Sequence, residues 1–466
     1  MGLALRLIRA TWLFGVIFLS YMSQLALSRV FARSGDAPPW LARRKERIDL
    51  KNARRLYRGM LKLRGVFIKL GQVLSIMGGF LPRAYQTELE SLQDNVPPHP
   101  FREVEKAFRL AFQKSPEALY ADISREPVAA ASLGQVHVAH LTTGEKVAVK
   151  VLYPQIREII KVDMRVLGWA IRVYQWFFPF RGIESVHASL VDLLRRETDY
   201  LHEAACMERM AKNFADEGDI LFPSVVHELT TRDILTMTYM EGAKITDFDA
   251  YERLGISREK VAKRLVESFY KQLFLHRFFH ADPHPGNFLV RAGKDGDPEI
   301  VVLDFGAISE VSDELIDGAF EILSGLMTED GDKVLVGFRQ MGFVAEEGNK
   351  KLLEQTVMTY FKKLLKIKDR SPGALMRAQR KDLEKLANPE VDRMELRELM
   401  RSFQYPEGWF YVERASVLAF WLCGRIDPNL DAMSVGIPHV MPAFMERQLA
   451  KQLASASATP PPAPAG

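Results

Sequence analysis

The sequence predicts an α+β fold in which two lobes follow an N-terminal helical extension. Apolar residues recur at helical spacing over about 44–120 and then alternate with polar residues over 127–153. A second short set of strands is expected near 233–240, and helical spacing dominates from Ile256 onward. The two lobes would meet near 241–242, and a joint of this kind is a common place for a ligand cleft.

Length and composition are those of an ordinary folded protein. The chain has 466 residues, which is too long for one typical domain and long enough to bury a sizeable core. Hydrophobic residues make up 47% and charged residues 26%. A net charge of +4 gives no reason to expect a nucleic-acid partner. The two cysteines, Cys206 and Cys423, provide neither a disulfide framework nor a zinc pattern, which favours a reducing compartment.

The N-terminus carries a membrane-anchor pattern, expected within residues 1–35. The stretch from Ala10 to Ser28 has no charged residue and would reach about 28 Å as a helix, close to the thickness of bilayer hydrocarbon. More Lys and Arg follow the stretch than precede it, which predicts an uncleaved anchor in the cytoplasmic membrane with the body in the cytoplasm. Polar residues in its second half leave a secretory signal or a helix lying on the membrane as alternatives. Membrane lipids are the expected partners.

A helical extension is expected over 36–120. Its segment 53–77 has apolar residues at helical spacing, interrupted by Gly65 and Gly71. Residues 80–119 predict two further helices separated by a proline-rich loop.

The two lobes are expected over 121–241 and 242–453. In the first, a hairpin over 127–153 turns at Thr-Thr-Gly-Glu, and a helical block runs to about Glu208. Residues 454–466, rich in Ala, Ser and Pro, cannot build a core and are expected to form a disordered tail.

Three residues around a strand in the second lobe have the spacing of a phosphoryl-transfer site. Asp282 is followed five positions later by Asn287, and the strand 299–306 then delivers Asp304 into an Asp-Phe-Gly turn. Magnesium prefers hard oxygen ligands, so Asn287 and Asp304 can each supply one while nucleotide phosphates supply others. Asp282 is then available to orient the attacking oxygen and accept its proton.

The His-x-Asp-x-His pattern at 280–284 is the alternative, because it could ligate zinc or iron. Pro283 and Pro285 exclude a regular helix or inner strand there. A zinc or iron site would also leave the asparagine and the second aspartate without a role. We therefore expect His280 and His284 to hold the loop in place through hydrogen bonds.

The first lobe offers a phosphate-covering loop and a lysine. The hairpin begins with Ala129-x-Ala131-x-x-Gly134-x-Val136, in which alanine stands in the first two glycine places of a nucleotide loop. Glycine is usual there because the backbone approaches the phosphates closely, so alanine predicts a different nucleotide pose. Val-Ala-Val-Lys then ends in Lys150 on the following strand.

Lys150 needs a carboxylate to position its ammonium group. A helix predicted over 195–210 offers Glu197, Asp199 and Glu203. On such a helix Asp199 and Glu203 share one face and Glu197 is turned away, so one acid can pair with the lysine while another serves a different partner. A solvated acidic helix is the alternative.

The combination resembles the UbiB/AarF family of atypical kinases, which has a two-lobed protein-kinase-like fold. The matching elements lie between about Tyr57 and Leu430. They are Lys69-Leu70-Gly71-Gln72, Ala129-Ala130-Ala131-Ser132, Lys150, Glu197-Thr198-Asp199, the stretch from His280 to Asn287, and Asp304-Phe305-Gly306. The chain departs from the family pattern at Cys206, where asparagine is frequent.

The resemblance implies ATP and Mg²⁺ as cofactors. Lys150 would bind the α and β phosphates with Glu203 as its ion-pair partner, and Asp282 would be the catalytic aspartate. Asn287 and Asp304 would hold magnesium. The cofactor-binding set is Ala129, Ala130, Ala131, Ser132, Lys150 and Met237.

The resemblance also implies a gate. The helix bearing Lys69 and Gln72 would lie across the place where a protein kinase binds its peptide. Lys69 would contact Glu197 and Asp199 and control access to the nucleotide.

The implied function is that of a membrane-associated atypical kinase or ATPase supporting isoprenoid quinone (ubiquinone) biosynthesis or lipid handling. A quinone precursor or quinone-biosynthesis proteins would be partners. No Ala-Pro-Glu element follows Asp304, which disfavours a protein kinase. A nucleotide-gated scaffold without turnover is the third interpretation, and the sequence gives no indication of oligomeric state.

Overall fold

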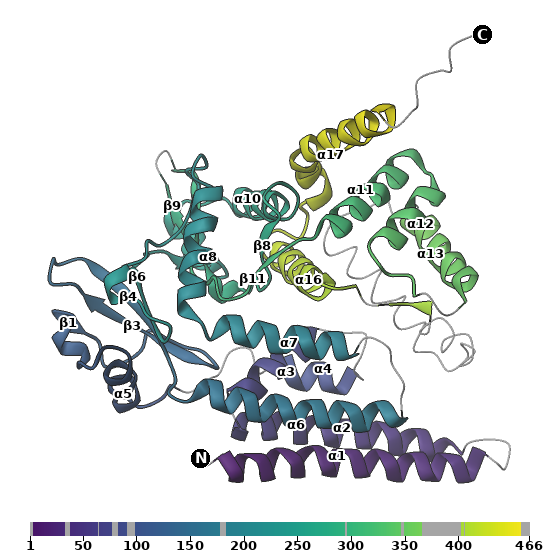
Figure 1. Cartoon of the computed structure of the whole chain (residues 1–466), viewed down its shortest axis with the longest axis horizontal. Helices are drawn as coiled ribbons and strands as arrows, with labels where there is room; N and C mark the ends of the chain where they lie inside the picture. The colour runs from purple at the N-terminus through teal and green to yellow at the C-terminus, as the bar shows by residue number, and fades with distance from the viewer. Residues whose placement is uncertain are drawn as a thin grey trace. The chain divides into compact units, whose positions relative to one another are not determined.

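The structure is a computed structural model (Figure 1). It describes residues 3–32, 38–63, 65–76, 83–90, 98–177, 183–293, 296–345, 349–365, 402–404 and 406–457. The chain divides into two compact units, and each is described by itself. Unit 1 is Met1–Glu208 with Pro223–Met240, and unit 2 is Arg209–Phe222 with Glu241–Gly466.

Unit 1 contains an antiparallel sheet of order β1-β3-β4-β6, with β2 pairing β3 at its side. The strands are β1 (Asp122–Ile123), β2 (Ala129–Ala130), β3 (Gly134–His140), β4 (Lys146–Leu152) and β6 (Ile234–Thr238). The predicted hairpin is confirmed: β3 and β4 pair from Gly134↔Leu152 to His140↔Lys146. Helix α5 (Phe101–Phe112) packs on this sheet, and its Phe108 shares one small apolar core with Val149 and Ile234.

The remaining part of unit 1 is helical. Its helices are α1 (Leu3–Ala32), α2 (Pro39–Leu63), α3 (Val66–Ile76), α4 (Arg83–Glu90), α6 (Ile156–Phe177), α7 (Ile183–Glu197) and α8 (Tyr200–Asn213), the last of which continues into unit 2. Gly65 has a φ of 59° and separates α2 from α3, as expected for a residue that adopts the left-handed region without strain. The expected interruption at Gly71 is wrong, because that glycine lies inside α3.

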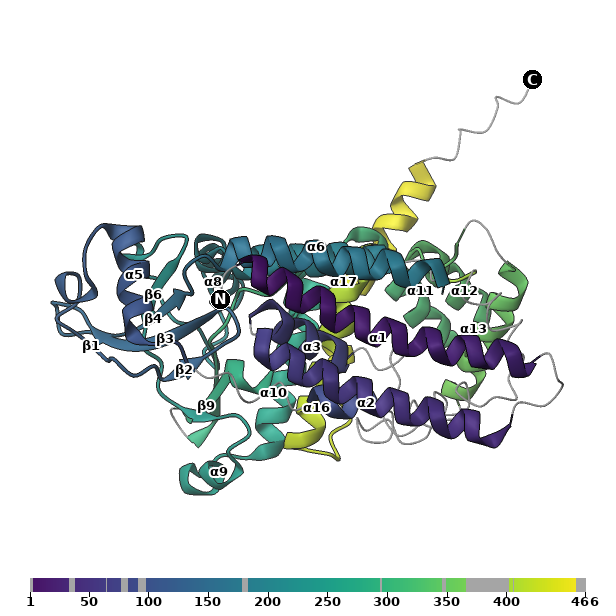
Figure 2. The same cartoon turned by 90° about the horizontal axis from the view of Figure 1, so that it is seen from below.

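Helix α1 lies along α2 and α6, as Figures 1 and 2 both show. By length and composition it is the one helix in the described part of the chain that could cross a membrane. The candidate span is Ala4–Phe31, whose most apolar window has a mean hydropathy of 1.5.

The single helix predicted over 195–210 is wrong, because α7 ends at Glu197 and α8 begins at Tyr200. The Thr198 hydroxyl donates to the Leu194 carbonyl at 2.8 Å, and Arg157 Nε donates to the Thr198 carbonyl at 2.9 Å. Arg157 also pairs with Asp233 at 2.6 Å. Side chains therefore satisfy carbonyls at the end of α7 that a continuous helix would use itself, and the chain turns.

Unit 2 holds a sheet of order β5-β10-β9-β7 and a separate two-stranded sheet, β11-β8. The strands are β5 (Ile220–Leu221), β7 (Ala243–Lys244), β8 (Phe278–His280), β9 (Phe288–Ala292), β10 (Pro298–Val302) and β11 (Ile308–Glu310). Only the β5–β10 pair is parallel among these described strands.

The helices of unit 2 are α9 (Phe248–Leu254), α10 (Arg258–Tyr270), α11 (Asp313–Thr328), α12 (Gly331–Gln340), α13 (Lys350–Leu365), α16 (Trp409–Ile426) and α17 (Ala432–Ser457). The expected start of the tail at residue 454 is wrong, since helix α17 continues to Ser457. Residues 458–466 of that tail lie outside the described residues.

Candidate functional site

Lys150 and Glu203 form an ion pair within unit 1. Strand β4 places Lys150 between Val136 of β3 and Leu235 of β6, and its Nζ bonds the Oε1 of Glu203 in the first turn of α8. Their side chains are only 12% and 2% exposed. Of the three acids offered by the sequence, Glu203 is thus the one that the structure brings to Lys150, as predicted.

The expected phosphate loop runs from β2 into β3. Ala129 and Ala130 form β2, and the Ala131 amide donates to the Gly134 carbonyl at 2.8 Å, which closes a tight turn over a buried Ser132. Gly134 is required by crowding. A Cβ there would lie 2.5 Å from the Val151 carbonyl oxygen and 2.9 Å from the Tyr200 hydroxyl.

Met237 lies on β6, where it pairs with Ala148 of the lysine-bearing strand and is buried. Met237 therefore lies on the strand next to that of Lys150, and its cofactor role stays a prediction.

The predicted gate has one formed contact. Lys69 of α3 pairs with Glu197 at the end of α7, with Nζ and Oε1 2.6 Å apart and both side chains about one-tenth exposed. Asp199 instead accepts from Arg232 Nε at 3.0 Å. The expectation that Lys69 contacts both acids is met for Glu197, while the break between α7 and α8 sends Asp199 to another cation. Gln72 lies in α3, but its side chain is outside the described part.

In unit 2, hydrogen bonds hold the 280–287 loop. The His280 Nδ1 accepts from the Asp282 amide at 3.3 Å, and the His284 Nδ1 accepts from the Gly286 amide at 3.2 Å. The expectation that these histidines hold the loop is confirmed. Burial lowers the pKa of His280, so the ring is held neutral and suited to accepting. No three His, Cys, Asp or Glu side chains gather as a metal cluster among the described residues, which gives a zinc or iron site no support there.

The same loop is tied to the Asp-Phe-Gly turn. The Leu303 amide donates to the Asn287 carbonyl at 2.9 Å, and the Ala281 amide donates to the Ala307 carbonyl at 2.7 Å. Phe305 of this turn is fully buried, and its ring lies 5.9 Å from that of Phe222. Residues far apart in sequence therefore share one small framework.

The residues present fit a magnesium ion carried by a nucleotide. The Asn287 amide nitrogen donates to the Asp282 carbonyl at 3.0 Å, which orients the side-chain oxygen of Asn287 away from that carbonyl. Asp304 accepts from the Gly306 amide at 3.0 Å through Oδ1, so its carboxylate direction is set. An amide oxygen and a carboxylate are the hard ligands that Mg²⁺ accepts when phosphates and waters complete its shell.

Sequence reasoning missed Arg414. This residue of α16 places its Nη2 2.7 Å from Oδ2 of Asp282, and the two side chains are 5% and 15% exposed. It lies on the buried face of an apolar helix, next to Ala415 and one turn from Leu418. An arginine on such a face indicates a buried anionic partner, but the pattern does not say which one.

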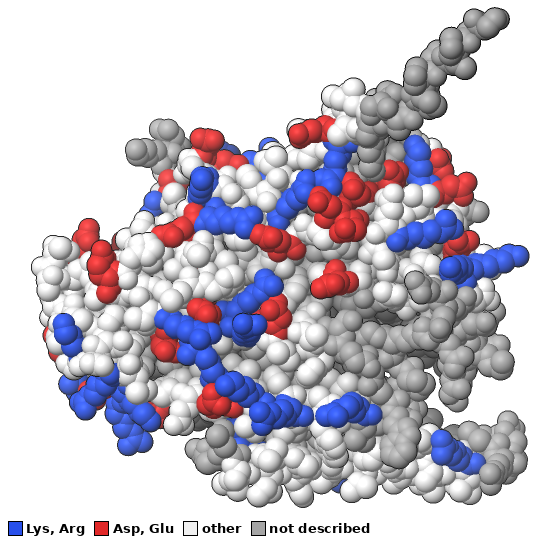
Figure 3. All heavy atoms as spheres, viewed as in Figure 1, with Lys and Arg blue, Asp and Glu red and all other residues white. Residues whose placement is uncertain are grey.

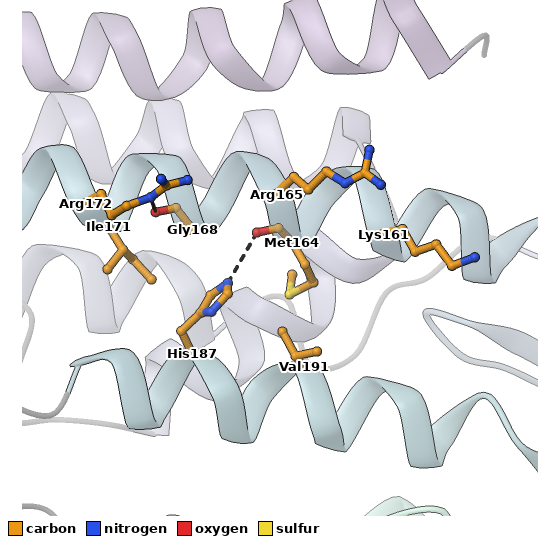
Figure 4. A pocket seen from close by; sticks show the side chains of 8 residues that line it. All are labelled: Lys161, Met164, Arg165, Gly168, Ile171, Arg172, His187 and Val191. Carbon is orange, nitrogen blue, oxygen red and sulfur yellow. Dashed lines mark hydrogen bonds between the residues drawn. The ribbon is translucent and has the colours of Figure 1, made fainter.

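A hollow of about 660 Å³ lies elsewhere in unit 1, between α6 and α7. Figure 4 shows cationic side chains of α6 around it and His187, whose Nε2 is 3.2 Å from the Met164 carbonyl oxygen. Its lining is Lys161, Met164, Arg165, Gly168, Ile171, Arg172, His187 and Val191. None of the predicted site residues is among them.

Comparison with known families shows which family the chain belongs to. The ABC1 atypical kinase-like domain matches residues 91–336, which is more than half of the chain and includes Lys150, Asp282 and Asp304. The chain belongs to the UbiB/AarF (ABC1) family of atypical kinases. The predicted resemblance and the mixed helix-and-sheet kinase-like fold with N-terminal helices are confirmed.

Several relatives carry kinase names. The chain is 30% identical over 468 residues to Protein ACTIVITY OF BC1 COMPLEX KINASE 8, chloroplastic, of Arabidopsis thaliana, covering 96% of this chain and 59% of the relative. It is 33% identical to AarF domain-containing kinase 1 of Drosophila melanogaster, covering 58% of this chain and 52% of the relative. Probable protein kinase UbiB of Pseudomonas aeruginosa is 29% identical, with 91% of this chain and 82% of the relative covered. The chain thus spans little more than half of the length of the plant and fly relatives.

Proposed function

We propose that this chain is a membrane-associated atypical kinase or ATPase that binds Mg-ATP and supports isoprenoid quinone biosynthesis. The observation that carries the nucleotide part is the framework of unit 2, in which Asp282, Asn287 and the Asp304 turn are joined by hydrogen bonds. The Lys150–Glu203 pair supplies the complementary cation. The quinone part rests on family membership alone.

Each residue has a proposed part in the chemistry. Lys150 neutralises the α and β phosphates, and Glu203 keeps its ammonium in one direction. Asn287 and Asp304 hold the magnesium, which supplies charge neutralisation at the phosphates. Asp282 orients the hydroxyl of the acceptor, either water or a lipid-like alcohol, and takes its proton.

The test is magnesium-dependent ATP turnover by the full chain, with and without liposomes and a phenolic quinone-precursor mimic. We expect phosphate release that lipid or mimic increases. It should be lost in Asp282→Asn with nucleotide binding retained, and in Asp304→Asn with magnesium-dependent binding weakened. Unchanged magnesium-dependent nucleotide affinity in Asp304→Asn would contradict the metal assignment.

A second candidate is a nucleotide-gated scaffold without turnover. The Lys69–Glu197 pair favours it, because this pair ties α3 to the end of α7. A tied α3 would act as the expected gate and limit access of nucleotide to the site. This candidate predicts tight nucleotide binding without phosphate release under every condition, and faster nucleotide binding in Lys69→Ala.

A further inference from the structure

Several polar side chains of α1 bond the two helices on which it packs. Arg6 pairs with Asp163 of α6 through two contacts, 2.8 Å from Nε to Oδ1 and 2.5 Å from Nη2 to Oδ2, and these side chains are 7% and 0% exposed. Further along, the Tyr21 hydroxyl donates to Asp49 of α2 at 2.6 Å. The Gln24 amide donates to the Leu41 carbonyl at 3.0 Å. The inner face of α1 is therefore tied to α2 and α6 by polar contacts, beside the buried apolar Ala10 and Leu13.

One exposed stripe of α1 is almost entirely apolar, with the exposed Arg9 beside it. Positions 5, 8, 12, 16, 19, 23, 26 and 30 fall on one stripe of a helix, and only one of them, Ser23, is polar. Four large side chains of the stripe are about two-thirds exposed: Ile8, Trp12, Leu19 and Val30. Figure 3, in the view of Figure 1, shows a largely uncharged surface at the lower edge, where α1 lies.

The exposed apolar stripe departs from the pattern of a surface helix in water. Such a helix turns its apolar side chains to the core and its polar side chains to the solvent. A contiguous apolar surface of this length indicates an apolar surrounding medium, and bilayer hydrocarbon is one.

The inward contacts also keep α1 lying along the body of unit 1. They extend from Arg6 to Gln24, so they hold most of the helix against α2 and α6. If α1 left the body to cross a bilayer, Asp163 would lose the guanidinium that compensates its buried charge. Docked α1 can meet lipid only along its side.

The neighbouring helix supplies charge for an anionic lipid surface. Positions 44, 51, 55, 58 and 62 lie on one stripe of α2, and all five are Lys or Arg. Arg44 donates to Ser23 Oγ on the outer face of α1 at 3.0 Å and also bonds Gln24. The basic stripe thus lies beside the apolar stripe, where phosphates of anionic lipids would surround a helix embedded at headgroup depth.

We propose that α1 lies flat in the surface of an anionic bilayer, with its outer stripe in the hydrocarbon and its inner face docked on α2 and α6. This proposal deepens the membrane association in the proposed function by giving it a geometry. It is independent of the nucleotide chemistry, because the stripe contains none of the proposed site residues.

The first test measures flotation of the full chain with vesicles of phosphatidylcholine, with or without phosphatidylglycerol. We expect binding to the anionic vesicles that falls by about tenfold or more in Ile8→Glu/Leu19→Glu. The matched control is Leu110→Glu on α5, which changes a leucine that is 69% exposed and should bind like the unaltered chain. A cooperative thermal unfolding transition serves as the folding check and should persist in all variants. Equal vesicle binding by the double variant and the control would overturn the proposal.

Charge gives a second variant that leaves the apolar stripe intact. Lys51→Gln/Arg58→Gln should weaken binding to the anionic vesicles and reduce its salt dependence, while binding to pure phosphatidylcholine stays unchanged. If α1 instead faces a second copy of the chain, Ile8→Glu/Leu19→Glu would dissociate a dimer in the absence of vesicles, and this result would overturn the lipid assignment.

A third measurement separates the flat from the spanning orientation. Leu5→Cys and Val30→Cys place thiols near opposite ends of the stripe, and the two native cysteines are both buried. On sealed vesicles, a flat helix leaves both labels on the outer leaflet at the same shallow depth, quenched by headgroup quenchers. Protection of one end alone from reagents added outside would mean that α1 spans, and would overturn the flat geometry.

Discussion

At the scale of single residues, the Lys150–Glu203 pair combines burial with charge. Removing one partner of such a pair leaves the other charge uncompensated in a poorly solvated place. We expect Glu203→Gln to lower the free energy of unfolding by about 3 kcal/mol, measured by urea denaturation. The double variant Lys150→Met/Glu203→Leu should recover much of this loss, because neither charge is then buried alone. A loss in Glu203→Gln no larger than that in exposed Glu117→Gln would argue against an energetically important pair.

Arg414 allows a test of how Asp282 is positioned. Its Nη2 bonds Asp282 Oδ2, so Arg414→Gln should let the carboxylate turn and lower kcat by about a hundredfold, with little change in KM for ATP. Arg414→Lys should restore part of the rate, because it keeps a cation. Arg425→Gln, an exposed change on the same helix, is the control. A hundredfold rise in KM for ATP without a fall in kcat would mean that Arg414 serves nucleotide binding instead.

His137 predicts a pH dependence of stability. Burial lowers its pKa from the ordinary value of 6.5. Its ring nitrogens lie 2.7 Å from the Ser124 carbonyl oxygen and 2.9 Å from Gln135 Nε2, and Phe101 packs on it. The unfolded chain takes up this proton at a higher pH than the folded chain, so stability from His137 is present above about pH 6.5 and declines as pH falls toward the folded-state pKa.

In this pH range, His137→Gln should flatten the decline in thermal midpoint. His140→Gln, a change of a half-exposed histidine on the same strand, should leave the decline in place. A parallel decline in the His137 variant and the unaltered chain would assign the pH dependence to other groups.

Among the secondary-structure elements, the sequence predicted those that depend on neighbouring residues alone. The β3–β4 hairpin follows from alternation over a few residues and a Gly-containing turn. The break between α7 and α8 depends on Arg157, which arrives from α6, and the Arg414–Asp282 pair joins α16 to a distant loop. Which side chains of α1 are exposed likewise depends on the face that meets α2. Contacts of this kind arise from tertiary structure, which periodicity alone does not specify.

A substitution at Gly134 tests how closely strand β3 must approach strand β4. A methyl group there meets the carbonyl oxygen of Val151, which belongs to the paired strand and cannot move aside as a flexible side chain would. We expect Gly134→Ala to cost about 1–3 kcal/mol in denaturation and to weaken nucleotide binding, because the adjacent turn at Ala131 shifts. Gly218→Ala is the control, since its added methyl meets nothing within 4 Å. Equal stability of both variants would contradict the crowding.

At the scale of the whole molecule, nucleotide binding should register as stability of the folded chain. A ligand that binds only the folded state adds RT ln(1 + [L]/Kd), which is about 2.7 kcal/mol when the ligand is a hundred times above its dissociation constant. Mg-ATP should therefore raise the thermal midpoint of the full chain more than ATP with a chelator does. Asp304→Asn should remove the magnesium-dependent part of this rise, because it takes away the carboxylate ligand, while Lys150→Met should remove most of the rise in both conditions. A full magnesium-dependent rise in Asp304→Asn would place the ion on other ligands, and no rise in the unaltered chain would refute nucleotide binding at the tested concentration.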